Sequence, residues 1–194
     1  MTENFLKAYN EVMSSEGLYS NHPADKGGET WKGVARKFYP NWEGWKIIDE
    51  VKKTETNLNK VLSANEKLEI LVKEFYYKNY FTDIKLDKLN EVDIVVELFD
   101  IAVNMGPKTA IDFLQRSLNL LNNSQKLYKD IVVDGDFGNT SYNTYKVYMA
   151  SRNVKNNAKI LIKALNGFQF NRYVKICEMN PTQEIFFYGW LNRV

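Results

Sequence analysis

Apolar residues recur along most of the chain with the three- and four-residue spacing of one helix face. The first such series consists of Phe5, Leu6, Tyr9, Val12 and Met13, and Thr2 stands where a helix N-cap is expected. Residues 63–66, Ser-Ala-Asn-Glu, form a capping box that predicts the start of a longer helix through Tyr76. The same reasoning predicts helices over residues 42–51, 92–103, 107–121, 139–150, 157–179 and 182–192, with Asn139 or Thr140 as a cap.

The periodicity disappears between residues 18 and 33, where turn-forming residues crowd together. This segment is too long and too rich in glycine and asparagine for a simple connector, so it predicts an ordered loop or a short hairpin. A tight turn is predicted at Asp134-Gly135-Asp136. Its alternating carboxylates also suggest a calcium loop, but the glycine spacing and closing glutamate of an EF-hand loop are missing, which favours the plain turn.

Charge and composition exclude several kinds of function. Lys and Arg number 26 against 24 Asp and Glu, so no strong positive field marks a nucleic-acid binder. Cys177 is the only cysteine and His22 the only histidine, which leaves no intramolecular disulfide and no Cys-based zinc site. No stretch is long and apolar enough for membrane insertion. We therefore expect neither a metal nor a cofactor.

Glu16 occupies the most informative position. It extends the apolar series of Tyr9 and Val12 by one helical step, so its carboxyl is expected on the buried face of the first helix. It also falls in the last turn, at the negative end of the helix dipole. Burial and dipole both raise a carboxyl pKa, and cleavage of a glycosidic bond needs a proton donor that stays protonated near neutral pH. The alternative is a helix-terminal glutamate that turns into water.

A longer pattern begins at Glu16. Residues 16–34, EGLYSNHPADKGGETWKGV, resemble the signature of glycoside hydrolase family 108 muramidases, which occur in phage endolysins. That signature has Glu-Gly-Gly-Tyr, then Asn-x-Pro-x-Asp-x-Gly-Gly-x-Thr. Residues 99–115, 133–140 and 187–193 are similar to elements of the peptidoglycan-binding domain that accompanies the family. The resemblance covers nearly the whole chain.

The resemblance implies a fold and a reaction. The fold is a lysozyme-like α+β fold, mainly α-helical, with a glycosidase segment at residues 1–90 and a peptidoglycan-binding segment at residues 91–194. The reaction is hydrolysis of the β-1,4 bond between N-acetylmuramic acid and N-acetylglucosamine in the glycan strands of peptidoglycan.

The resemblance also implies the site residues, with Glu16 as the general acid. Asp25 and Thr30 stand where phage-type lysozymes keep a second carboxylate and a hydroxyl, although the interval between them is one residue shorter here. They would orient the attacking water or stabilise positive charge on the sugar ring. Asp25 could equally be a turn residue that accepts hydrogen bonds from nearby backbone amides. The expected sugar contacts are Tyr19, Asn21 and Asn104.

Two positions depart from the family pattern. Leu18 replaces the usual second glycine, so the turn there is less free to adopt a positive φ. Tyr80-Phe81 replaces a frequent Tyr-Trp, which puts in doubt the stacking of a sugar on an indole ring. Neither change removes a carboxylate.

Two other functions fit the same residues. A lytic transglycosylase would use Glu16 as its acid but the sugar's own hydroxyl as nucleophile, and a peptidoglycan-binding or secretion-assisting protein would keep the fold without catalysis. The N-terminus has no signal-peptide pattern, so we expect synthesis in the cytoplasm and access to the wall through holin-type release or another export route. The oligomeric state is left open.

Overall fold

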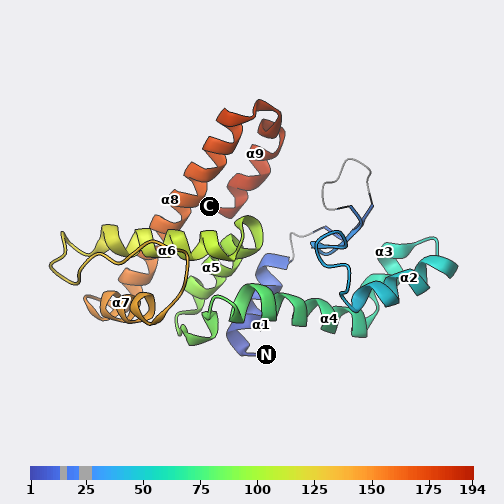
Figure 1. Ribbon diagram of the computed structural model, residues 1–194, viewed down its shortest axis with the longest axis horizontal. Coiled ribbons are helices and arrows are strands. Elements are labelled where there is room, and N and C mark those ends of the chain that lie inside the picture. The colour runs from blue at the N-terminus through green and yellow to red at the C-terminus, as the bar shows by residue number, and fades with distance from the viewer. Residues whose placement is uncertain (14–16, 22–27) are drawn as a thin grey trace. The chain divides into compact units, whose positions relative to one another are not determined.

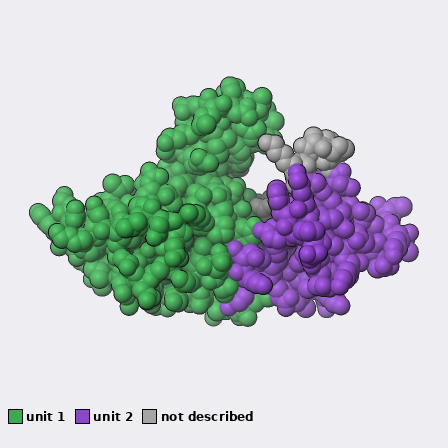
Figure 2. Space-filling view, in the orientation of Figure 1, with its two compact units in different colours: residues 1–8, 80–194 green, residues 9–79 purple. Residues whose placement is uncertain are grey.

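The computed structural model describes residues 1–13, 17–21 and 28–194 (Figure 1). Two compact units emerge, one of residues 1–8 and 80–194 and the other of residues 9–79 (Figure 2). The sequence-based division at residue 90 stays a prediction. Glu16, His22 and Asp25 lie outside the described residues.

The unit of residues 9–79 combines short helices with a small sheet (Figure 1). Its strands pair antiparallel in the order β1-β2-β3. The elements from the N-terminus onward are α1 (Glu3–Met13), β1 (Tyr19–Ser20), β2 (Thr30–Trp31), β3 (Val34–Ala35), α2 (Gly44–Thr54), α3 (Leu58–Ser63), α4 (Glu66–Tyr76) and the π-helical segment η1 (Tyr77–Thr82).

A two-residue turn joins β2 to β3, so a hairpin, one of the two structures expected of residues 18–33, forms at the end of that segment. Its residues, Lys32 and Gly33, have φ of 43° and 78°, the positive values that a turn matching the twist of a hairpin requires. A lysine is unfavourable there, but it is held on two sides. Its Nζ lies 2.7 Å from Glu69 Oε2, and its carbonyl accepts a 2.8 Å hydrogen bond from Tyr76 Oη.

The apolar face predicted for α1 is mostly buried, with Leu6 an exception. Phe5, Tyr9 and Val12 are at most 4% exposed, whereas Leu6 is 39% exposed. In the unit of residues 1–8 and 80–194, the Phe5 ring packs edge-on against Phe81 and Phe99, with centroids 5.2 and 5.9 Å away. The predicted helix is therefore confirmed over Glu3–Met13.

The start of α4 is predicted correctly, but its cap is not. Asn65 is the N-cap, and its side chain accepts a 2.9 Å hydrogen bond from the amide of Leu68. Ser63 instead closes α3, a helix that the sequence did not predict. A residue in the last turn of one helix has helical torsion angles, so it cannot adopt the extended conformation of an N-cap for the next.

The unit of residues 1–8 and 80–194 is built around α5. Ile94, Val95, Leu98 and Phe99 on α5 are fully buried, as expected of a helix packed on several sides. The elements are η2 (Leu86–Lys88), α5 (Val92–Met105), α6 (Pro107–Leu121), α7 (Asn139–Ala150), α8 (Val154–Met179), η3 (Pro181–Gln183), α9 (Glu184–Trp190) and η4 (Leu191–Arg193).

The ends of these helices confirm some predictions and correct others. Pro107 begins α6 as expected. Gly138, with no side-chain cap, precedes α7, so the predicted cap at Asn139 or Thr140 was wrong. Helix α8 begins earlier than residue 157, because Asn153 caps it by accepting a hydrogen bond from the Asn156 amide.

Gln115 organises the predicted turn at residues 134–136. Its amide nitrogen donates to Asp134 Oδ1 at 2.8 Å and to the Asp136 carbonyl at 3.0 Å. Its oxygen accepts from the amides of Asp134 and Gly135. A hydrogen-bond donor thus occupies the centre of the loop, where a calcium ion would need oxygen ligands, and this favours the plain turn.

Candidate active-site region

Three of the predicted site residues lie on or beside the small sheet. Tyr19 is in β1, Asn21 directly follows it, and Thr30 is in β2. Asn21 is exposed, whereas Tyr19 and Thr30 are half-buried. The chain segment between β1 and β2 contains Asp25, whose placement is outside the described residues.

The register of the sheet separates Tyr19 from Thr30. Tyr19 pairs with Trp31, whereas Thr30 pairs with Ser20 and with Ala35. Directly opposed residues share a face of the sheet and neighbours along a strand alternate, so Tyr19 and Thr30 belong to opposite faces. These two predicted residues therefore do not converge on one point.

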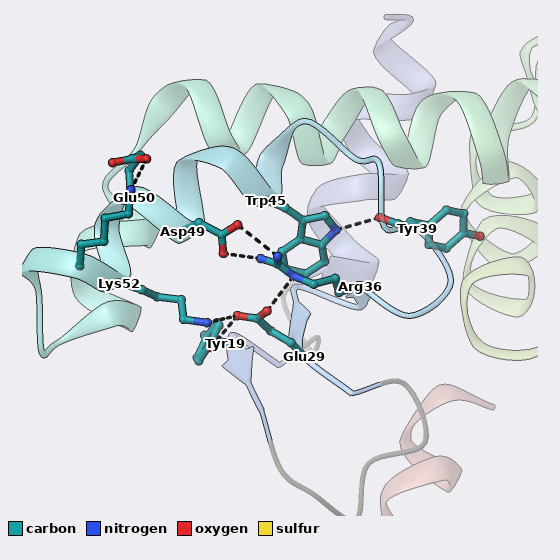
Figure 3. A network of polar contacts seen from close by, with 9 residues as sticks. Tyr19, Glu29, Arg36, Tyr39, Trp45, Asp49, Glu50 and Lys52 are labelled. Carbon is teal, nitrogen blue, oxygen red and sulfur yellow. Dashed lines mark hydrogen bonds and ion pairs between the residues drawn. The ribbon is translucent and has the colours of Figure 1, made fainter.

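Glu29, the residue before β2, is the centre of a polar network (Figure 3). Its Oε1 accepts 2.7 Å hydrogen bonds from Tyr19 Oη and Lys52 Nζ. Its Oε2 forms an ion pair with Arg36 Nε, also at 2.7 Å. The Glu29 side chain is only 11% exposed, so it needs this charge compensation.

Arg36 links this carboxylate to α2. Its two terminal nitrogens donate to Asp49 at 2.6 and 3.1 Å, in the planar two-point geometry that suits a guanidinium and a carboxylate. The guanidinium carbon lies 4.5 Å from the centre of the Trp45 ring, and Trp45 Nε1 donates to the Tyr39 carbonyl at 2.8 Å (Figure 3). The hairpin is thus fastened to one face of α2.

The contacts of the network shift the pKa values of several of its side chains. The hydrogen bonds from Arg36 lower the pKa of Asp49, and the hydrogen bond to Glu29 raises the pKa of Lys52. Burial, followed by the hydrogen bond to Glu29, raises the pKa of Tyr19. Both Glu29 oxygens are engaged by cations, so this carboxylate is suited to holding the ends of the β1–β2 segment in place and not to attacking a substrate.

Sequence reasoning missed this network, although one signal was present. Trp45, Asp49 and Lys52 follow a spacing of four and three residues, which places them on one side of a helix. That pattern shows that an aromatic ring, an acid and a base share a face of α2. It does not name their partners, Glu29 and Arg36, which come from the hairpin.

Tyr19 also borders an open pocket of about 420 Å³. The pocket is lined by Thr56, Asn57, Leu58 and Asn59, and the amide of Tyr19 donates to Asn59 Oδ1 at 3.0 Å. The aromatic ring and the two side-chain amides match what an N-acetyl sugar offers, an apolar ring face together with amide and hydroxyl groups.

Asn104 belongs to the other unit, near the C-terminal end of α5. Its Oδ1 accepts a 2.8 Å hydrogen bond from Tyr173 Oη. Both residues line a pocket of about 360 Å³ with Trp190, whose ring stacks on Tyr173 at 5.1 Å. Phe81, in contrast, is fully buried, so it offers no ring face to a sugar.

Residues 1–13, 17–21 and 28–194 contain no group of three His, Cys, Asp or Glu side chains arranged to hold a metal ion. None of the helices in this part of the chain combines the length and the apolar character needed to cross a bilayer.

Comparison with known families and structures assigns both parts of the chain. The model of the glycosyl hydrolase 108 family matches residues 9–106, and a model described as a predicted peptidoglycan domain matches residues 109–194. Among solved structures, SagA of Brucella abortus is similar with a TM-score of 0.60 and 23% identity, over 97% of this chain and 88% of that one. No curated protein matches the chain.

These comparisons confirm the expected fold, which is α+β, mainly α-helical and lysozyme-like. They also support action on peptidoglycan, because a glycosidase-type segment is followed directly by a peptidoglycan-type segment.

Proposed function

The chain belongs to the glycosyl hydrolase 108 family, and from this premise we propose that it is an N-acetylmuramidase. It hydrolyses the β-1,4 bond between N-acetylmuramic acid and N-acetylglucosamine in peptidoglycan. The observation that carries this proposal is the succession of the two family matches along one chain, residues 9–106 and then 109–194.

Glu16 is the proposed general acid. In the sequence it stands one helical step beyond Tyr9 and Val12, which are both buried, and this spacing favours a protonated carboxyl. Proton transfer from Glu16 to the glycosidic oxygen lets the sugar depart as positive charge develops on the ring.

Asp25 and Thr30 are proposed to act on the opposite side of the reacting carbon. A carboxylate there stabilises the positive charge or takes a proton from water, and a hydroxyl orients that water. Thr30 is in β2, and the fastening of this strand by Glu29 and Arg36 limits the movement of its hydroxyl.

Tyr19, Asn21 and Asn104 are the proposed sugar contacts. Tyr19 borders an open pocket with two asparagines, and Asn104 borders a pocket with two aromatic rings. Both surroundings combine ring faces with amide groups, which is the composition of many carbohydrate sites. We also propose that the protein reaches the wall through holin-type release or another export route.

The test is digestion of purified sacculi, followed by mass spectrometry of the soluble fragments. Reducing muramic acid ends are expected. Anhydromuramic ends would instead identify a lytic transglycosylase, and binding to sacculi without fragments would identify a non-catalytic protein. Glu16→Gln keeps the shape but removes the acid, so its rate should fall by about two to four orders of magnitude.

Glu3→Gln is the matched control for this substitution. Glu3 is exposed in the first turn of α1, so its replacement should leave the rate unchanged. Full activity of the Glu16 variant would reject the assignment of the acid.

A further inference from the structure

Helices α6 and α8 pack together in the unit of residues 1–8 and 80–194 (Figure 1). A basic groove runs between them. It has a volume of about 380 Å³. Four cationic side chains line it: Lys108 and Arg116 from α6, and Arg172 and Lys175 from α8. Their spacing, eight residues on one helix and three on the other, points them to the facing sides of the two helices.

The charge of the groove is only partly compensated by the protein itself. Asp112 is the one acidic residue of the lining, and its Oδ2 lies 3.5 Å from Arg116 Nη1. The positive charge of Lys108 also interacts with the carboxylate of Asp134, which lies outside the groove. Within the described residues, Arg172 and Lys175 are exposed and form no ion pair with an acid. The groove is therefore suited to an anionic ligand.

The floor of the groove is aromatic. The rings of Phe113 and Phe168 are stacked with centroids 5.5 Å apart. The Arg116 guanidinium lies over Phe168, 4.3 Å from the ring centre, so one wall offers an apolar face and a cation side by side. A ligand that matches both the cationic side chains and the aromatic floor carries carboxylates or similar anions together with small apolar groups.

We propose that this groove binds the stem peptide of peptidoglycan through its free carboxylates. The stem is a short peptide that combines alanine methyl groups with carboxylates, which matches the aromatic floor and the basic rim. Thr109 and Asn171, which also line the groove, can hydrogen-bond to its amides. This inference rests on the proposed function. It goes further by naming the stem peptide as the part of peptidoglycan that the C-terminal segment recognises.

The neighbouring pocket supports the same occupant. Arg172 lines both the groove and the pocket formed by Asn104, Tyr173 and Trp190. In peptidoglycan the stem is attached to the lactyl group of muramic acid, so sugar and peptide are always adjacent. A muramic acid residue at Trp190 therefore brings its stem to Arg172 and into the groove.

A phosphate-rich wall polymer fits the groove less well. Such a chain carries a charge on every unit and few apolar groups, so it is favoured by a continuous basic track. Here Asp112 interrupts the basic rim, and aromatic rings form the floor. The peptide is thus the occupant that both the charge and the apolar surface favour.

The test uses the full chain with Glu16→Gln, so that no fragment is cut during the measurement. Calorimetry compares three probes: a disaccharide-tetrapeptide with free carboxylates, the same disaccharide without peptide, and polyglycerol phosphate. The groove variant Arg172→Gln/Lys175→Gln should bind the first probe at least tenfold more weakly, and its loss of affinity for the stem-free disaccharide should be much smaller, because of the two residues only Arg172 also borders the sugar pocket. The difference in affinity for the first probe between this variant and the parent should become smaller at high salt, where charge contacts are screened.

Lys155→Gln/Lys163→Gln is the matched control, because it removes two charges from exposed positions of the same helix outside the groove. It should bind every probe as the parent does, and both variants should melt at the parent's temperature. Equal affinity of the groove variant and the parent for the peptide probe would overturn the proposal, as would a preference for the phosphate polymer. Product analysis of the active chain tests the proposed function separately, so either idea can fail while the other stands.

Discussion

Arg36 and Asp49 form a two-point ion pair, with guanidinium nitrogens 2.6 and 3.1 Å from the two carboxylate oxygens. The same arginine pairs with Glu29 at 2.7 Å and covers the Trp45 ring. One side chain thus connects the hairpin of the candidate site to α2.

Arg36→Lys should therefore lower the stability of the protein. An ammonium group cannot contact both Asp49 oxygens and Glu29 with the same planar geometry. Because the Arg36 side chain is 31% exposed and Asp49 45%, solvent screens part of the effect. We expect a loss of about 1–2 kcal/mol in the free energy of unfolding, measured by urea denaturation.

Lys46→Met is the control for this measurement. Lys46 pairs with Glu43 at 2.8 Å, but both side chains are more than 60% exposed. Such pairs contribute about 0–1 kcal/mol, so little change is expected. If the two variants lose the same stability, Arg36 is an ordinary surface residue and not the link described above.

Gly44→Ala should disturb the start of α2. A Cβ at this position would lie 2.2 Å from the Trp42 ring, which is too close for any side chain. Trp42 also packs edge-on against Trp45 at 5.2 Å, so its ring is held by packing. We expect a loss of about 1–3 kcal/mol, seen as a lower melting temperature.

Gly167→Ala is the matched substitution in a second helix. Gly167 lies inside α8, and a Cβ there meets nothing within 4 Å. Alanine should stabilise this helix by about 0.5–1 kcal/mol. The same substitution is thus expected to lower the stability of the protein at Gly44 and to raise it at Gly167. A change in the same direction at both positions would contradict the packing of Trp42 over Gly44.

Local patterns predicted those parts of the fold that depend on neighbouring residues. The buried face of α1 follows from the spacing of Phe5, Tyr9 and Val12, and the start of α6 from Pro107. Even there, the folded chain uses Asn65 as the cap of α4 where the pattern favoured Ser63. The choice depends on the preceding helix α3, which has too few residues for a clear periodic signal.

Contacts between distant segments could not be predicted in the same way. Lys52 and Glu29 are separated by 23 residues and Arg36 and Asp49 by 13. Each charged residue has many possible partners in the sequence, and only the folded chain selects one. The roles of Glu16 and Asp25 stay predictions from the motif, whereas the register of the sheet shows that Tyr19 and Thr30 belong to opposite faces.

Gln115→Glu tests the turn at residues 134–136. Gln115 is 1% exposed, and its amide donates to Asp134, to the Asp136 carbonyl and to Ser141. A carboxylate of the same shape loses these donors and faces Asp134 directly. We expect the free energy of unfolding at pH 7 to fall by about 2–4 kcal/mol, as measured by denaturant unfolding.

The loss should become smaller at low pH, where the introduced carboxyl is protonated and can donate again. Asn119→Asp is a milder comparison on the same helix, because Asn119 is half-buried and makes only two such contacts, with the backbone of Ile131. A loss in the Gln115 variant no larger than in the Asn119 variant would contradict the central place of Gln115 in the turn.

Glu97 should make the stability of the protein fall as the pH rises. Burial, together with the negative charge of Asp100, raises the pKa of Glu97 from 4.5 to about 8. Above pH 4.5 the unfolded chain releases this proton, whereas the folded chain keeps it until about pH 8. The stabilisation contributed by the protonated Glu97 side chain is therefore complete below pH 4.5 and is lost as the pH rises toward 8.

Glu97→Gln removes this dependence, since the amide stays neutral at every pH. The melting temperatures of variant and parent should be similar at pH 4.5, and the variant should melt higher by about 5 °C or more at pH 8. Asp100 is paired with Arg193 and accepts from Gln169, so the substitution leaves those contacts in place. Glu55→Gln, at an exposed position, should show no such trend. Parallel pH profiles for the parent and the Glu97 variant would show that Glu97 is ionised in the folded protein at neutral pH.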